Sequence, residues 1–160
     1  MHKHPHGGKM NTTDITAADV HSLCDVYNHI VVRDPEVTFV LFHLDYTSPD
    51  VVVTPERGEK AQLTVCSKTG KPVFIRIPLW AKDKPLSLCV NGEKRPCKLI
   101  GQYLRVEAAG SETRISLSYE LPERITRETT NGVEYTLGWK GDMVTGISPN
   151  AEYLPFYADL

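Results

Sequence analysis

The sequence predicts a mainly β protein, an antiparallel β-sandwich of about 10 strands preceded by one N-terminal α-helix. From Val37 onward, apolar and polar residues alternate with a period of two, which is the period of a strand with one buried face. Proline and glycine interrupt this alternation at short intervals, as they do in sandwiches and barrels. A parallel sheet would need crossover helices between its strands, and the sequence contains only one convincing helix.

The chain divides into three expected parts. Residues 1–15 are polar and rich in His, Gly and Lys, which predicts a flexible tail. Residues 16–32 form the expected helix, with Thr16 as N-cap and Asp19 in the first turn. Residues 33–160 form the expected sandwich domain. The helix has an apolar stripe at helical spacing, made of Val20, Leu23, Cys24, Tyr27, Ile30 and Val31.

Short segments with strand character follow one another along the rest of the chain. Asn91-Gly92 and Asn131-Gly132 each separate two of them, and Asn and Gly best tolerate the positive φ that a type I′ hairpin turn requires. Within a strand, alternate side chains face the core, as expected for Ile75 and Leu117. The candidate strands are residues 37–46, 50–54, 61–66, 72–78, 85–90, 93–99, 102–107, 113–119, 124–130, 133–139 and 143–148.

Composition narrows the classes of partner and compartment. A chain of 160 residues that is 41% hydrophobic is long enough for one domain with a single core, and its net charge of −2 argues against nucleic acid. No apolar run is long enough to cross a bilayer, and no signal peptide is present in this chain, so we expect a soluble protein without a membrane partner. The cysteines form no C-x-x-C pair, which indicates reduced thiols and favours the cytoplasm; they are Cys24, Cys66, Cys89 and Cys97.

Two groups of histidines have the chemistry of metal ligands. His21, Asp25 and His29 share one helical face at i, i+4 and i+8, and imidazole and carboxylate both bind zinc. That face lies away from the apolar stripe, so a solvated polar face is the more economical interpretation. The tail residues His2, His4 and His6 are interpreted as incidental sequence. We therefore expect no metal and no cofactor.

The sequence offers no self-evident catalytic machinery. It lacks a Gly-x-Ser-x-Gly elbow, a phosphate-binding glycine loop and a His-Glu-x-x-His helix. A glycosidase needs two carboxyl groups at a defined separation, and most carboxylates here fall at turns or on outward strand positions.

Aromatic residues suggest a different use, because sugar rings stack on Trp and Tyr. Trp80, Tyr103 and Trp139 are the candidates for glycan contact, with core filling as the alternative. The apolar cluster at residues 153–157 is expected to cover a sheet edge or to dock onto a neighbouring domain.

Five short motifs follow one another along the chain, namely Ile75-Arg76-Ile77-Pro78-Leu79-Trp80, Val90-Asn91-Gly92-Glu93, Gly101-Gln102-Tyr103-Leu104, Trp139-Lys140-Gly141-Asp142 and Ile147-Ser148-Pro149. Their order resembles the C-terminal β-sandwich region of β-L-arabinofuranosidase-type glycoside hydrolases, family 127 and its relatives. The resemblance covers about Ala18 to Tyr157. It implies that the helix corresponds to the last helix of an (α/α)6 toroid. It also implies that active members of the family use a cysteine nucleophile at a zinc site, with an adjacent Cys-Cys pair shortly before this helix. The corresponding stretch here, residues 9–13, has no cysteine, so no catalytic residue is carried over.

Two functions follow as hypotheses. The first is a non-catalytic accessory domain that stabilises or flanks a helical toroid absent from this chain, with that catalytic domain or a homodimer partner covering the apolar helix face. The second is a stand-alone module that binds carbohydrate or another protein. Exposed aromatic rings in a shallow groove favour the second hypothesis, whereas buried rings and an apolar patch around the helix favour the first.

Overall fold

The computed structural model describes residues 12–130 and 132–149, which form one helix and fourteen strands. The predicted fold class, mainly β with a sandwich and a single N-terminal helix, is confirmed. Most of the predicted tail lies outside the described residues, as do Asn131 and the apolar cluster at residues 153–157.

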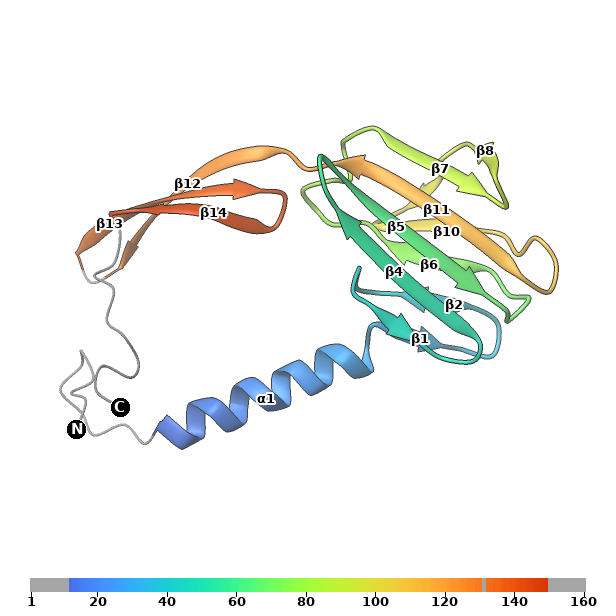
Figure 1. Cartoon of the computed structure of the whole chain (residues 1–160), viewed down its shortest axis with the longest axis horizontal. Helices are drawn as coiled ribbons and strands as arrows, with labels where there is room; N and C mark the ends of the chain where they lie inside the picture. Colours follow the sequence, from blue (N-terminus) through green and yellow to red (C-terminus); the bar gives the residue numbers. More distant parts are fainter. Residues whose placement is uncertain (1–11, 131, 150–160) are drawn as a thin grey trace.

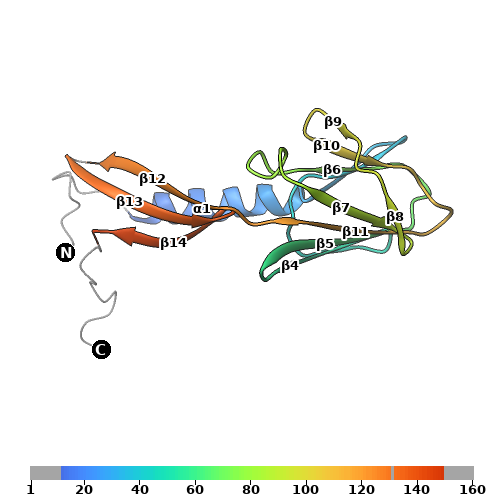
Figure 2. The ribbon, with the colours of Figure 1, turned by 90° about the horizontal axis from the view of Figure 1, so that it is seen from above.

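Two sheets form the two layers of the sandwich (Figures 1 and 2). The strands of the five-stranded sheet, in spatial order, are β1 (Val31–Arg33), β2 (Thr38–Val40), β6 (Val73–Arg76), β10 (Tyr103–Val106) and β9 (Leu99–Ile100). Those of the six-stranded sheet are β3 (Tyr46–Thr47), β4 (Val51–Arg57), β5 (Lys60–Ser67), β11 (Thr113–Glu120), β7 (Leu86–Val90) and β8 (Glu93–Arg95). Adjacent strands are antiparallel except for β2 and β6, which pair in parallel.

The core lies between the two sheets and follows the predicted alternation. In β11 every second side chain is buried, and the same holds for Val73 and Ile75 of β6. The Asn91-Gly92 turn joins β7 to β8 with φ of 50° and 83° at its two residues, so the predicted positive-φ hairpin is confirmed.

Helix α1 (Thr12–Asn28) starts and ends earlier than the sequence suggests. Thr16 lies inside the helix and is therefore not its N-cap. The predicted last turn is instead part of the sandwich, since Ile30 and Val31 are buried in the core and the Ile30 carbonyl accepts a hydrogen bond from Leu41 N at 2.9 Å. Burial of these two side chains against the sheets outweighs their helical spacing.

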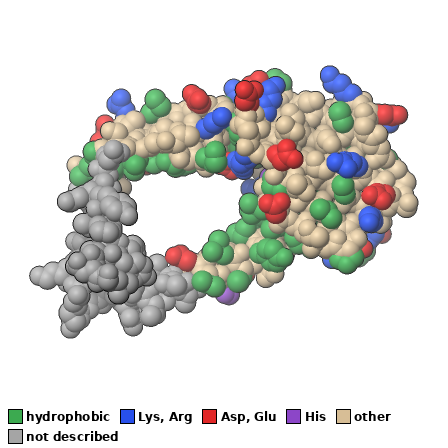
Figure 3. All heavy atoms as spheres, in the orientation of Figure 1, with side chains coloured by type: hydrophobic (Ala, Val, Ile, Leu, Met, Phe, Trp, Pro, Cys, Tyr) green, Lys and Arg blue, Asp and Glu red, His purple; other side chains and the backbone are tan. Residues whose placement is uncertain are grey.

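The last three strands leave the sandwich and form a sheet of their own, in the order β12 (Glu123–Thr130), β13 (Val133–Lys140) and β14 (Met143–Ser148). We call α1 the helical arm and β12–β14 the sheet arm. Both arms project from the same end of the sandwich (Figure 1), and an open space separates them (Figure 3). The expected division into a tail, a helix and one sandwich domain over residues 33–160 stays a prediction.

Candidate functional site

A cavity of about 390 Å³ lies where the sheet arm meets the sandwich, and we call it the junction pocket. Strand β6 ends at Arg76, and Pro78, which has no backbone N–H, helps the chain to leave the sheet and reach the pocket. The apolar lining residues are Leu41, Phe42, Leu44, Pro78, Leu79 and Trp80. The polar lining residues are His43, Arg57, Arg76 and Asp142.

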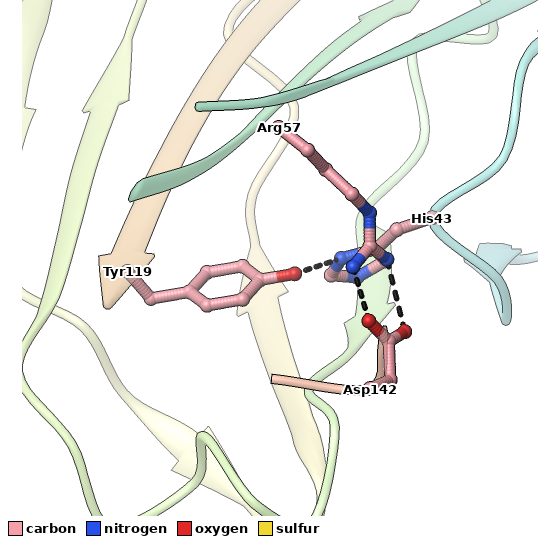
Figure 4. A network of polar contacts seen from close by, with 4 residues as sticks. All are labelled: His43, Arg57, Tyr119 and Asp142. Atoms are coloured by element: carbon pink, nitrogen blue, oxygen red, sulfur yellow. Dashed lines mark hydrogen bonds and ion pairs between the residues drawn. The ribbon is translucent and has the colours of Figure 1, made fainter. Parts of the chain in front are cut away.

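Both ring nitrogens of His43 have protein partners, which fixes the tautomer of the ring. Nε2 lies 2.9 Å from the carbonyl oxygen of Arg76, which only accepts hydrogen bonds, so Nε2 carries the proton and donates it. Nδ1 is then the acceptor for the hydroxyl of Tyr119, whose oxygen lies 2.5 Å away (Figure 4). His43 is therefore a neutral imidazole with neither nitrogen free.

The protonation states agree with this geometry. Burial lowers the pKa of His43 from 6.5 to about 4, and the hydrogen bond to the Arg76 carbonyl opposes this shift only in part. Burial also raises the pKa of Tyr119 from 10.0 to about 12. At neutral pH, His43 is uncharged and Tyr119 keeps its proton. A general base needs an accessible lone pair, and His43 has none, so these two residues hold the pocket wall together.

An ion pair connects the sheet arm to the sandwich across the pocket. Arg57, at the end of β4, donates from Nη1 to Oδ1 of Asp142 and from Nη2 to Oδ2 at 3.0 Å (Figure 4). Asp142 lies in the turn between β13 and β14. The hydrogen bond to Asp142 raises the pKa of the Arg57 guanidinium, which stays charged. A bidentate pair of this kind constrains orientation, so it sets how the sheet arm meets the sandwich.

Close packing at Gly141 fixes the same junction from the other side. Gly141 has a φ of 62°, and a Cβ there would lie 2.7 Å from Leu121 Cδ2 and 3.2 Å from Trp80 Cη2. The Trp80 ring also packs on Tyr119, with 5.7 Å between ring centroids. The sequence motifs at residues 75–80 and 139–142 thus come together at the junction pocket.

The three aromatic residues expected to contact glycans lie in three different places. Trp80 belongs to the junction pocket, whereas Tyr103 packs edge-on against Phe39 on the outer face of the five-stranded sheet, with 5.9 Å between ring centroids. Trp139 lies in the sheet arm, where Arg124 covers its ring at 4.7 Å and its Nε1 donates to a threonine hydroxyl. All three rings are half-buried. Glycan contact by these residues stays a prediction, and they do not share one groove.

The helical arm does not gather its candidate metal ligands into a three-ligand cluster. Nε2 of His21 lies 3.5 Å from a carboxylate oxygen of Asp25, and Nδ1 of His29 lies 2.7 Å from the backbone carbonyl of Asp25, to which it donates. Within residues 12–130 and 132–149, no group of three or more His, Cys, Asp or Glu side chains is placed to hold a metal. All four cysteines are free thiols, and Cys24 is the exposed one. None of the helical residues described here forms a segment long and apolar enough to span a membrane.

Neither His43 nor Arg57 was predicted from the sequence as a site residue. His43 is 76 positions from Tyr119, and Arg57 is 85 positions from Asp142, so no local spacing connects either pair. The available signals were weak ones: a histidine in an apolar stretch, and an arginine and an aspartate that each stand next to a glycine.

The fold has solved relatives, although no protein-family model and no curated protein matches the sequence. The GH127 β-L-arabinofuranosidase Ara127N from Geobacillus stearothermophilus T6 is similar at a TM-score of 0.52 and 17% identity, over 73% of this chain and 21% of that chain. A structure described as a glycoside hydrolase is similar at a TM-score of 0.54 and 18% identity, over 79% of this chain and 24% of that chain.

These comparisons confirm the predicted resemblance at the level of the fold. The chain has the fold of one part of a family-127-type glycoside hydrolase. It spans about a quarter or less of the length of the solved chains that it matches.

Proposed function

We propose that this chain is a non-catalytic accessory β domain of a glycoside hydrolase, and that the catalytic residues of the enzyme lie outside these 160 residues. The similarity to two solved glycoside hydrolases over 21% and 24% of their length is the observation that carries the proposal. In this role the sandwich stabilises or flanks the catalytic domain.

The chemistry of the junction pocket supports a non-catalytic role. Glycoside hydrolysis usually needs a pair of carboxyl groups, one as acid and one as base or nucleophile. Among the described lining residues, Asp142 is the one carboxylate, and Arg57 holds both of its oxygens. His43 has no free nitrogen to replace the second carboxyl group.

The mass and activity of the native polypeptide test this proposal. An antibody raised against this domain should detect a polypeptide far above 17.9 kDa in the source organism. That polypeptide should hydrolyse an aryl β-L-arabinofuranoside, the class of substrate named for one of the similar structures, whereas the 160-residue chain should not. A band at 17.9 kDa, or turnover by the chain alone, would contradict an accessory role.

A carbohydrate-binding module is the second candidate, and the half-buried Trp80 ring at the edge of the junction pocket favours it. In that case, titration with arabinose-containing oligosaccharides should change the tryptophan fluorescence of the chain, and Trp80→Ala should remove the change. Trp139→Ala serves as the control, since that ring lies in the sheet arm.

A further inference from the structure

The outer faces of the two sandwich sheets differ in chemistry. On the six-stranded sheet, Thr64 of β5 and Ser116 of β11 are paired and point outward, because the residues on either side of each are buried. Gln62 and Ser118 form the next pair on that face. On the five-stranded sheet, the outward positions of β2, β6 and β10 are aromatic residues and arginines. Figure 2 shows the two sheets on opposite sides of the molecule, so each outer face is a separate surface.

Three rings from three neighbouring strands form a continuous cluster on the five-stranded sheet, and we call this surface the aromatic face. Phe39 of β2 lies 5.3 Å from Phe74 of β6 and 5.9 Å from Tyr103 of β10, measured between ring centroids. Ile100 of β9 pairs with Tyr103 and is 48% exposed, so it extends the apolar surface to the edge of the sheet. The three rings are half-buried, so their accessible area is small compared with the roughly 800 Å² that each partner buries in a stable protein interface. The aromatic face is therefore suited to a small ligand with a flat apolar side.

Two arginines give the aromatic face a positive charge. The Cζ atom of Arg105 lies 5.7 Å from the centre of the Phe74 ring, and its Nε donates to Oε1 of Glu107 at 2.6 Å. Arg76 pairs with Tyr103 across the strands, so its side chain belongs to the same face. Within residues 12–130 and 132–149, no carboxylate oxygen lies within 4.0 Å of the Arg76 guanidinium. The aromatic face therefore carries one positive charge that no described carboxylate neutralises.

We propose that the aromatic face binds a glycan that contains uronic acid. The apolar C–H side of a sugar ring packs against Phe39 and Tyr103, and the sugar carboxylate accepts two parallel hydrogen bonds from Arg76. A neutral glycan would leave the Arg76 charge without a partner, and a small inorganic anion would leave the rings uncovered. A uronate supplies both the apolar ring and the carboxylate. The inference goes beyond the proposed function, since an accessory domain and a stand-alone module can both carry such a face.

Single-stranded nucleic acid is the competing ligand, because it also combines flat rings with negative charge. Its charge repeats at every phosphate, and its affinity comes from several cations along one groove. The aromatic face has one arginine without a described carboxylate partner, and the chain has a net charge of −2. One carboxylate on a sugar ring therefore matches the charge of this face better than a run of phosphates.

Titration of the 160-residue chain with matched ligands tests the ligand class. The probes are tetragalacturonate, a hyaluronan tetrasaccharide, the methyl ester of tetragalacturonate and a thymidine tetranucleotide. At least one of the two uronate glycans should bind, and the methyl ester should bind at least about tenfold more weakly than tetragalacturonate, because it loses the charge-assisted hydrogen bonds. Equal affinity for the acid and its ester overturns the inference. Tighter binding of the tetranucleotide, or no binding of either uronate glycan, overturns it as well.

Substitutions with a matched control separate the two parts of the recognition. Arg76→Gln should weaken binding of the uronate glycan at least about tenfold and leave binding of the methyl ester unchanged. Tyr103→Leu should weaken binding of both ligands, because both use the ring. Arg114→Gln is the control, since Arg114 is exposed on the outer face of the six-stranded sheet, and it should bind both ligands as the unmodified chain does. Unchanged binding by Arg76→Gln, or an equal loss in Arg114→Gln, overturns the inference.

Chemical shifts of the unmodified chain locate the site without relying on the folding of any variant. Addition of the uronate glycan should shift backbone amide signals of β6 and β10 and leave those of β5 and β11 in place. Shifts confined to β5 and β11, or to the residues of the junction pocket on β4 and in the turn at Asp142, would place the ligand elsewhere and overturn the inference. The proposed function is tested separately, by the mass and turnover of the native polypeptide, so either proposal can fail while the other stands.

Discussion

Strand β11 in the sandwich and strand β14 in the sheet arm show how differently two β regions of one chain are covered. In β11, alternate side chains are buried, with Ile115 and Leu117 at 0% and 1% exposure. In β14, every side chain is exposed, including Val144 and Ile147. Apolar residues in a strand therefore do not by themselves show that the strand is packed in the core of the chain.

This difference predicts where the stability of the chain resides. Each aliphatic side chain buried between the sheets contributes about 1.5–3 kcal/mol relative to an exposed one. The exposed apolar residues of the arms contribute little of this burial free energy. The sandwich should therefore contribute most of the unfolding free energy of the chain.

The largest expected effect is the loss of a core side chain. Ile115→Ala should lower the free energy of unfolding by about 2–5 kcal/mol, because it leaves a cavity between the sheets. Ile147→Ala in the sheet arm is the matched control and should change it by less than about 0.5 kcal/mol. Urea unfolding followed by circular dichroism measures both. Equal losses would mean that the sheet arm is already packed in the chain alone.

Acid should weaken the junction through His43. The pKa of His43 is about 4 in the folded protein and about 6.5 when exposed, so the unfolded chain binds the proton more tightly. The contribution of neutral His43 to stability is therefore complete above pH 6.5 and falls by roughly 3 kcal/mol as the pH drops to 4. His43→Gln should flatten this part of the curve of unfolding free energy against pH. If the variant keeps the wild-type slope, another group causes it.

A methyl group at Gly141 should disturb the contact between the arm and the sandwich. Gly141→Ala places a Cβ 2.7 Å from Leu121 Cδ2 at a position whose φ is 62°, so both crowding and backbone strain oppose it. We expect a loss of about 1–3 kcal/mol in unfolding free energy and a change in Trp80 fluorescence. Gly146→Ala in the same arm meets no atom within 4 Å and should be close to neutral. If Gly141→Ala leaves the unfolding free energy unchanged, the sheet arm must shift to accommodate the added Cβ.

The sequence predicted features that depend on local periodicity. The alternation in β6 and β11, the Asn91-Gly92 hairpin and the apolar stripe of α1 all follow from residues close together in the chain. The end of the helix was misplaced because Ile30 and Val31 fit a helical stripe as well as a strand, and only their burial between the sheets decides the matter.

The candidate site could not be predicted from the sequence, for a related reason. The partners of His43 and Arg57 lie 76 and 85 positions further along the chain, and two sheets and an arm must be in place before these contacts form. The sequence also did not show that the sheet arm is separate from the sandwich, since apolar and polar residues of β13 alternate much as they do in a core strand.

The smallest expected effect concerns the ion pair between the arm and the sandwich, and it distinguishes orientation from stability. Arg57→Gln should lower the unfolding free energy by less than about 1 kcal/mol, because the pair is partly exposed and solvent screens it. Arg95→Gln removes an exposed ion pair within the sandwich and is the matched control. Only the Arg57 variant should broaden the distribution of distances between a spin label at Cys24 and one at Glu128→Cys, an exposed position of the sheet arm, in a background where the other cysteines are replaced by serine. If that distribution keeps its width, the packing of Trp80 against Gly141 is sufficient to orient the sheet arm, and the ion pair serves only to neutralise two charges at the edge of the pocket.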